Sequence, residues 1–331
     1  SSLFQDLVGG CKGRKRNSLP ATCGMAPEAA APRCERGRAA LDFLDGLALS
    51  AGAKAAAEAA AAQPRFACAE CGRATRLYCP RCIRTSLPLP PPLRLGVRAL
   101  VLRHPKEPAA KSSVSPLPLL APGAVEVREW TKGETPEAEL DRGSWLLYPR
   151  EGAVDAEEVD WRQVSQLVLI DSRWKHAGAV AASPELAALP AMRLGGGSAE
   201  GRSSCFWRSI TEKLDGVEGL LSTAECLHRA LLVRAAALEA AGAGDPGDVE
   251  RLDDLLLFHA LRLRLVIEDY ARDPQRCCPW CTEAERRRSV HAGNARTAAR
   301  KAVAAGDPEP AGGLEEASPP AELGAVGVSK K

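Results

Sequence analysis

Short apolar runs and helical patterns alternate between residues 63 and 271. Residues 99–102, 145–148 and 167–170 are apolar runs bounded by polar residues, which predict buried β-strands. Apolar positions then recur at helical spacing over 223–238 and again over 248–270. Strands followed by helices predict an α/β layer fold rather than a helical bundle or a β-sandwich. The pattern leaves the order of the strands open.

The two ends of the chain differ in composition from this middle part. Residues 1–62 carry the basic segment 12–16 and an alanine run over 48–62. We predict a flexible basic and alanine-rich extension with one exposed helix, because an alanine face has little area to bury. Residues 272–331 are polar and rich in Pro, Gly and Glu, which predicts a mostly disordered tail.

Length and charge exclude several classes of protein. The chain has 331 residues, 45% of them hydrophobic, which is enough for one large domain or two small ones. The net charge of +2 excludes a histone-like protein and a strongly acidic one. No apolar run approaches the roughly 18 to 20 residues that span a bilayer, so we expect no membrane partner. No obligate protein partner is indicated.

Twelve cysteines are present, and four of them form two closely spaced pairs. Cys68, Cys71, Cys79 and Cys82 follow the pattern C-x2-C-x7-C-x2-C, which lets four thiolates surround one Zn²⁺. Since all four ligands are protein groups, we predict a structural zinc knuckle; free or redox-active thiols are the alternative. Gly72 relieves the tight turn after the first pair. Cys277, Cys278 and Cys281 form a second cluster, to which His291 is a possible fourth ligand.

The predicted knuckle is strongly basic. Residues 63–103 contain eight arginines against a single glutamate. We predict that this region neutralises phosphates of a nucleic acid; a solvated basic face without a polyanion is the alternative. The arginines closest to the cysteine pairs are the expected RNA contacts: Arg73, Arg76, Arg81 and Arg84.

Polar side chains follow two of the predicted strands. His104 and Glu107 come directly after the first strand, with Ser112 a few residues on, and Asp171 ends the strand at 167–170. Ligands of open α/β sheets bind at the carboxyl ends of strands. Hydrogen bonding in a turn is the alternative role for His104, and capping of a following helix is the alternative for Asp171.

Two further segments carry candidate binding groups. Trp207 and Arg208 are suited to stacking on a base and holding an anion. Ser222 and Glu225 match the capping box S-x-x-E before the helix predicted at 223–238. A helix N-terminus is also an anion site, so both roles stay open.

The ordered segments HPKE, KSS, LLYP, LIDSRW, CFWR and LSTAE, downstream of the four cysteines, resemble the DTW-domain tRNA-uridine aminocarboxypropyltransferases over about residues 66–270. That family is similar to the SPOUT superfamily, whose α/β sheet is knotted. Together with the composition of the two ends, the resemblance gives four regions: the extension 1–62, the zinc knuckle 63–95, a SPOUT-like catalytic domain with flanking helices 96–271, and the tail 272–331.

The same resemblance implies the reaction. The 3-amino-3-carboxypropyl group of S-adenosylmethionine would pass to N3 of a tRNA uridine, giving acp3U and methylthioadenosine. Asp171 would be the catalytic base. The residues implied to line the donor or uridine pocket are His104, Glu107, Ser112, Trp174, Arg208, Ser222, Thr223 and Glu225. Trp207 and the knuckle arginines would contact RNA.

The sequence departs from the family signature Asp-x-Thr-Trp, because Arg173 stands where Thr is expected. If the Thr hydroxyl of the family contacts the donor, that contact is lost here. If the side chain faces RNA, Arg173 adds a contact to a phosphate. The alternatives to the transferase are a catalytically weak zinc-ribbon RNA-binding or scaffold protein and a SPOUT-type RNA methyltransferase. A Rossmann methyltransferase and a P-loop hydrolase are disfavoured, since neither glycine-rich loop is present. We expect a nuclear or cytoplasmic protein, with an organelle left open because the chain begins at Ser1 rather than Met.

Overall fold

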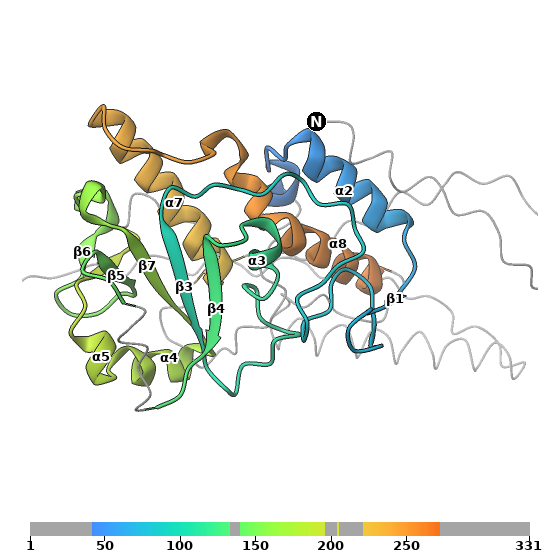
Figure 1. Cartoon of the computed structure of the whole chain (residues 1–331), viewed down its shortest axis with the longest axis horizontal. Helices are drawn as coiled ribbons and strands as arrows, with labels where there is room; N and C mark the ends of the chain where they lie inside the picture. The colour runs from blue at the N-terminus through green and yellow to red at the C-terminus, as the bar shows by residue number, and fades with distance from the viewer. Residues whose placement is uncertain (1–41, 133–139, 196–203, 205–220, 272–331) are drawn as a thin grey trace, which may run out of the picture.

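The fold is built on a six-stranded parallel sheet with the strand order β4-β3-β7-β5-β8-β6 (Figure 1). The structure, a computed structural model, describes residues 42–132, 140–195, 204 and 221–271. All neighbouring strands in this sheet are parallel, so their carboxyl ends all lie at one edge. The predicted α/β class is therefore confirmed. The knotted chain path stays a prediction.

Three of the strands coincide with the apolar runs, namely β3 (Arg98–Arg103), β5 (Ser144–Leu147) and β7 (Gln166–Asp171). The other three were not predicted: β4 (Val125–Glu129), β6 (Val154–Asp155) and β8 (Ala191–Arg193). β4 and β6 are the sheet edges; in β4 only Val125 is buried, and β6 has only two residues. β8 has only three residues, too few for a pattern.

Both faces of the sheet are covered, and alternate residues of the central strands belong to different cores. Ala99 and Val101 of β3 pack in the larger core, while Leu100 and Leu102 pack in the smaller one. The larger core includes residues of α3 (Leu117–Leu120), η3 (Ala156–Glu158), η4 (Trp161–Gln163) and α7 (Thr223–Ala240). The smaller core includes residues of α4 (Trp174–Ala181) and α5 (Pro184–Ala187). Double coverage explains why the central strands are apolar on both sides.

The two predicted helices are present, with one change. α7 begins at the predicted residue, and its capping box between Ser222 and Glu225 is formed. The segment predicted as one helix over 248–270 is instead a 3₁₀ helix η5 (Val249–Leu256) followed by α8 (Leu257–Ala271). Of the helices described, none is both long and apolar enough to cross a bilayer.

The N-terminal helix corrects a prediction. α2 (Ala51–Ala62) is not an exposed element, because Ala53, Ala56, Ala57 and Ala60 are buried in the larger core. α2 lies beside α8 in Figure 1. Small side chains let two helix backbones approach closely, so an alanine face here serves close packing rather than solvent exposure. The predicted flexible extension 1–62 is therefore wrong for residues 42–62, while residues 1–41, the predicted tail 272–331 and the cysteine cluster at 277–281 lie outside the described residues.

The start of α2 is fixed by a buried carboxylate. Ser50 caps the helix by accepting from the N–H of Ala53, and its hydroxyl donates to Oδ2 of Asp254 at 2.6 Å. The Ser50 N–H donates to Oδ1 of the same carboxylate at 2.8 Å. Asp254 is fully buried on η5, so its charge depends on these donors and on Arg251 at 3.4 Å.

Replacing Ser50 with Ala should lower the free energy of unfolding by about 1–2 kcal/mol, because the helix loses its cap and Asp254 loses a donor. Urea unfolding measures this change. Lys54→Ala, an exposed position on the same helix, is the matched control and should leave stability within about 0.5 kcal/mol. Equal stabilities of the two variants would contradict the role of Ser50.

Candidate functional site

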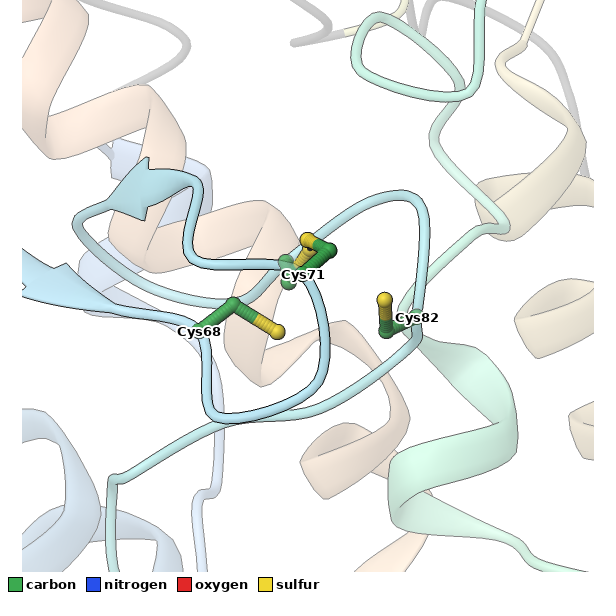
Figure 2. Close-up of side chains that lie close together, drawn as sticks. Cys68, Cys71 and Cys82 are labelled. Carbon is green, nitrogen blue, oxygen red and sulfur yellow. Dashed lines mark hydrogen bonds between the residues drawn. The ribbon is translucent and has the colours of Figure 1, made fainter.

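The four predicted zinc ligands converge. The sulfur atoms of Cys68, Cys71, Cys79 and Cys82 all lie within 4.8 Å of one another, and those of Cys71 and Cys79 are 3.6 Å apart. Figure 2 shows Cys68, Cys71 and Cys82 pointing toward a common centre. Four sulfurs about 2.3 Å from a tetrahedral Zn²⁺ would be about 3.8 Å apart. The donor set therefore fits a zinc ion with four thiolate ligands.

The two cysteine pairs lie in matching turns. The N–H of Gly72 donates to the carbonyl of Cys68 at 2.8 Å, and the N–H of Ile83 donates to that of Cys79 at 2.9 Å. Each turn ends in a left-handed residue, Gly72 at φ 67° and Ile83 at φ 50°. A β-branched residue rarely adopts this conformation, so the second turn is held by its surroundings. Gly72 thus has its predicted role in the first turn. In the second turn Ile83 takes the same left-handed conformation with backbone strain, which the sequence did not reveal.

Backbone donors favour a thiolate in this cluster. Burial opposes ionisation of Cys79, but the N–H groups of Cys82 and Arg81 and the neighbouring thiols lower its pKa to about 7. A thiolate is the form that binds zinc. The backbone donors therefore favour the thiolate at Cys79, whereas the hydrogen bond with Cys71, followed by burial, raises the pKa of Cys82 to about 12.

Gly72→Ala should destabilise the protein by about 1 kcal/mol. The added Cβ would meet no atom within 4 Å, so only the positive φ opposes it. The same replacement at Gly178 inside α4 should instead stabilise by about 0.5–1 kcal/mol, because an ordinary helical position favours alanine. Thermal unfolding of the zinc-loaded variants measures both signs. A stabilising Gly72→Ala would rule out the turn geometry.

The knuckle is docked on the main core. Its small sheet pairs β1 (Phe66–Ala67) with β2 (Ala74–Thr75), and Tyr78 between the cysteine pairs is buried. The Tyr78 ring packs edge-on against Phe258 of α8, with centroids 5.3 Å apart, and its hydroxyl accepts from Arg262 at 3.4 Å. Burial raises the Tyr78 pKa, Arg262 lowers it, and the charge of Asp171 raises it further. Tyr78 therefore connects the knuckle electrostatically to the carboxyl edge of the sheet.

The arginines proposed for RNA contact lie on the solvent side of this knuckle. Arg73, Arg81 and Arg84 are exposed and Arg76 is half-buried. Arg84 forms an exposed ion pair with Glu70 at 3.4 Å. Such a pair contributes little to stability, so the side chain is readily available to a phosphate.

The carboxyl edge of the sheet brings together residues that the sequence placed after separate strands. β3 and β7 pair in register, with Arg103 opposite Asp171. The N–H of His104 donates to the carbonyl of Asp171 at 2.9 Å, which continues the sheet by one residue. His104 and Asp171 are therefore neighbours at the centre of this edge.

Asp171 has the features of a reactive carboxyl group. It is 5% exposed, and its Oδ1 accepts from the hydroxyl of Thr223 at 3.2 Å. Burial raises its pKa to about 6; Glu107 adds to this, while the hydroxyls of Ser112 and Thr223 and the charge of Arg103 oppose it. Oδ2 accepts no hydrogen bond from the described residues. Since α4 begins after Arg173 and no side chain caps it, the alternative role of Asp171 as a helix cap is wrong.

The start of α7 closes the other side of this site. The hydroxyl of Ser113 accepts from the N–H of Ala224 at 3.2 Å, which ties the segment after β3 to the helix. Oε2 of Glu225 accepts from the N–H of Ser222 at 2.7 Å and from the hydroxyl of Ser204 at 2.6 Å. The N–H groups of Ala224 and Glu225 are thus already bonded within the chain, which favours a positioning role for Ser222 and Glu225 over anion binding.

The structure describes the side chains of some of the remaining predicted site residues and not of others. Glu107 and Ser112 are buried beside Asp171, since both influence its pKa. The backbone of Trp174 begins α4, but its side chain is outside the description. Trp207 and Arg208 lie outside the described residues.

Two aromatic residues at this edge were missed by the sequence interpretation. Trp130 follows β4, and its backbone N–H donates to the carbonyl of Arg103 at 2.8 Å. His176 lies in the first turn of α4. His104 stacks on both of them, with ring centroids 5.8 Å from Trp130 and 5.1 Å from His176. Trp130 could have been found if the alternation in β4 had been recognised as an edge strand; the sequence holds no local signal for His176.

Comparison with known families agrees with the predicted resemblance. The DTW-domain model matches residues 65–260, which is more than half of the chain and includes the knuckle, the sheet and α7. No curated protein and no solved structure matches. The DTW family acts on tRNA, and its domain implies a tRNA-modifying transferase. With the zinc-ligand cluster and the carboxyl-edge site both inside the matched region, the chain belongs to the DTW-domain family.

Proposed function

We propose that the protein transfers the 3-amino-3-carboxypropyl group of S-adenosylmethionine to N3 of a tRNA uridine. The new bond joins N3 to the carbon that leaves sulfur, and sulfur keeps the electron pair of the broken bond. The products are acp3U and methylthioadenosine. The observation that carries the proposal is Asp171, a buried carboxyl group with a free oxygen at the centre of the carboxyl edge of a DTW domain.

Asp171 is proposed to take the N3 proton. N3 of uridine is a weak acid that is nucleophilic mainly when deprotonated, so a base beside it lowers the barrier. A pKa of about 6 leaves Asp171 ionised at pH 7 and makes it a better base than an ordinary aspartate. Because the sulfonium is a good leaving group, alignment of N3, carbon and sulfur supplies the remaining acceleration.

The neighbouring residues are proposed to hold the reactants. Thr223 orients Asp171 through its hydrogen bond, and His104 borders the same edge. Glu107 and Ser112 are themselves buried and tune the pKa of Asp171. Ser222 and Glu225 act as positioning residues, because their capping box fixes Thr223. Trp174 and Arg208 stay proposed donor contacts.

The knuckle is proposed to bind tRNA through Arg73, Arg76, Arg81 and Arg84, with Trp207 as a further contact. The exposed arginines and the docking of Tyr78 on α8 support this placement. Zinc would hold these arginines in a fixed arrangement relative to the sheet. We propose no reaction step at the metal, since four thiolates leave no vacant ligand position.

Mass analysis tests the reaction directly. tRNA is incubated with the protein and S-adenosylmethionine and then digested to nucleosides. A uridine heavier by one aminocarboxypropyl group, together with methylthioadenosine, is expected. A methylated nucleoside with S-adenosylhomocysteine would identify a methyltransferase, and an unchanged tRNA would favour a binding or scaffold protein.

A further inference from the structure

Three aromatic rings form a row across the carboxyl edge of the sheet. The row consists of Trp130 after β4, His104 after β3 and His176 on α4, which follows β7. The His104 and His176 rings are 11° from parallel, and those of His104 and Trp130 are 25° from parallel. All three residues are half-buried, so none of them is withdrawn into the core.

His176, at one end of the ring row, favours its neutral form. Partial desolvation and the nearby positive charges lower the pKa of His176. In the middle of the row, the Nδ1 atom of His104 accepts from the N–H of Lys106 at 3.0 Å, which places the proton of its neutral ring on Nε2. The hydrogen bond also fixes the plane of the His104 ring. The row is therefore pre-arranged before any ligand arrives.

The surrounding charges select the ligand. The cationic side chains that act on His176 are Lys175, Lys106 and Arg173. The lysines and Arg173 are exposed. S-adenosylmethionine carries a net positive charge, so these cations repel it, whereas they attract a polyanion. Stacked rings among exposed cations are the usual surface for single-stranded nucleic acid.

We propose that the ring row is a stacking platform for an unpaired base of the tRNA, with Lys106, Arg173 and Lys175 on the flanking phosphates. This inference rests on the proposed function. Half-exposed rings beside Asp171 would let a base next to the target uridine stack there while the uridine enters the site. Arg173, which replaces the Thr of the family signature, then contributes to binding RNA rather than to holding the donor.

The test measures binding of an unmodified tRNA transcript and of a short oligouridylate in the absence of donor. His176→Ala should weaken binding of both by about five- to a hundredfold, and His176→Phe should restore it, because one stacked base contributes on this scale. Lys175→Ala should reduce the slope of log affinity against log salt by about one phosphate contact. Lys54→Ala on α2 is the matched control and should leave the slope unchanged.

Separate binding of S-adenosylmethionine distinguishes the two possible ligands. The platform predicts donor affinity unchanged in His176→Ala; a loss of donor affinity with normal RNA binding would overturn it. Equal salt slopes for Lys54→Ala and Lys175→Ala would also overturn it, since binding would then depend on overall charge. Because these measurements need no turnover, RNA binding that depends on the platform without acp3U formation would contradict only the proposed reaction.

Discussion

Asp171→Asn should reduce aminocarboxypropyl transfer by at least about a hundredfold while the protein stays folded. The amide keeps the size of the side chain and can still accept from Thr223, but it cannot take a proton. Single-turnover formation of acp3U at saturating donor measures the loss. The unchanged backbone bond between His104 and Asp171 leads us to expect normal tRNA binding.

The same replacement should not destabilise the protein. Asp171 has a folded-state pKa of about 6, raised from 3.8 by burial, so its ionised form opposes folding by about 3 kcal/mol at neutral pH. Because the folded-state pKa is raised, stability from this group is complete below pH 4 and is lost as pH rises through about 6. Asp171→Asn should abolish that part of the pH dependence, which thermal unfolding across pH 4–7 measures.

Asp155→Asn is the matched control for Asp171. Asp155 ends β6 at the edge of the same sheet, where it pairs with Arg193 at 2.6 Å. This change should leave transfer within about twofold of the parent, because a surface ion pair contributes little. The parent activity should also fall below about pH 6, as Asp171 becomes protonated. Normal turnover of Asp171→Asn would remove this residue from the mechanism.

Cys79→Ser should lower bound zinc from one ion per chain to nearly none and reduce the free energy of unfolding by several kcal/mol. Cys79 is fully buried within the cluster, so the other three thiols cannot rearrange around a missing ligand without moving the turns. Metal analysis of the purified variant gives the zinc content, and urea unfolding gives the stability. Chelation of the parent protein should reproduce both losses.

Cys226→Ala supplies the control for thiol chemistry. Cys226 lies on α7, and burial followed by the charge of Glu225 raises its pKa to about 12, so it stays a thiol rather than a metal ligand. Its zinc content should equal that of the parent. A parent protein that purifies without zinc and gains no stability from it would contradict the structural role of the four cysteines.

The sequence predicted those parts of the fold whose causes are local. Buried apolar runs gave β3, β5 and β7, and the capping box gave the first residue of α7. The C-x2-C pairs gave the cysteine cluster, because metal ligation requires that spacing. The DTW family was predicted from the order of short motifs and is confirmed.

The rest depends on contacts between distant segments. The alanine face of α2 carries no sign of its partner, since it is the packing against α8 and the core that buries it. The ring row brings together residues after three strands, and strand order cannot be read from hydrophobic patterns. The pKa of Asp171 is likewise set mainly by burial, a property of the assembled fold.

Helix α8 contacts both the knuckle and α2. Its Phe258 packs against Tyr78 of the knuckle, and α2 lies along its side. Residues far ahead of the sheet therefore depend on the last described helix for their packing. We infer that α2, the knuckle and the sheet melt together in one cooperative transition. The boundary that a family match draws at residue 65 would then cut through a unit of folding rather than mark its start.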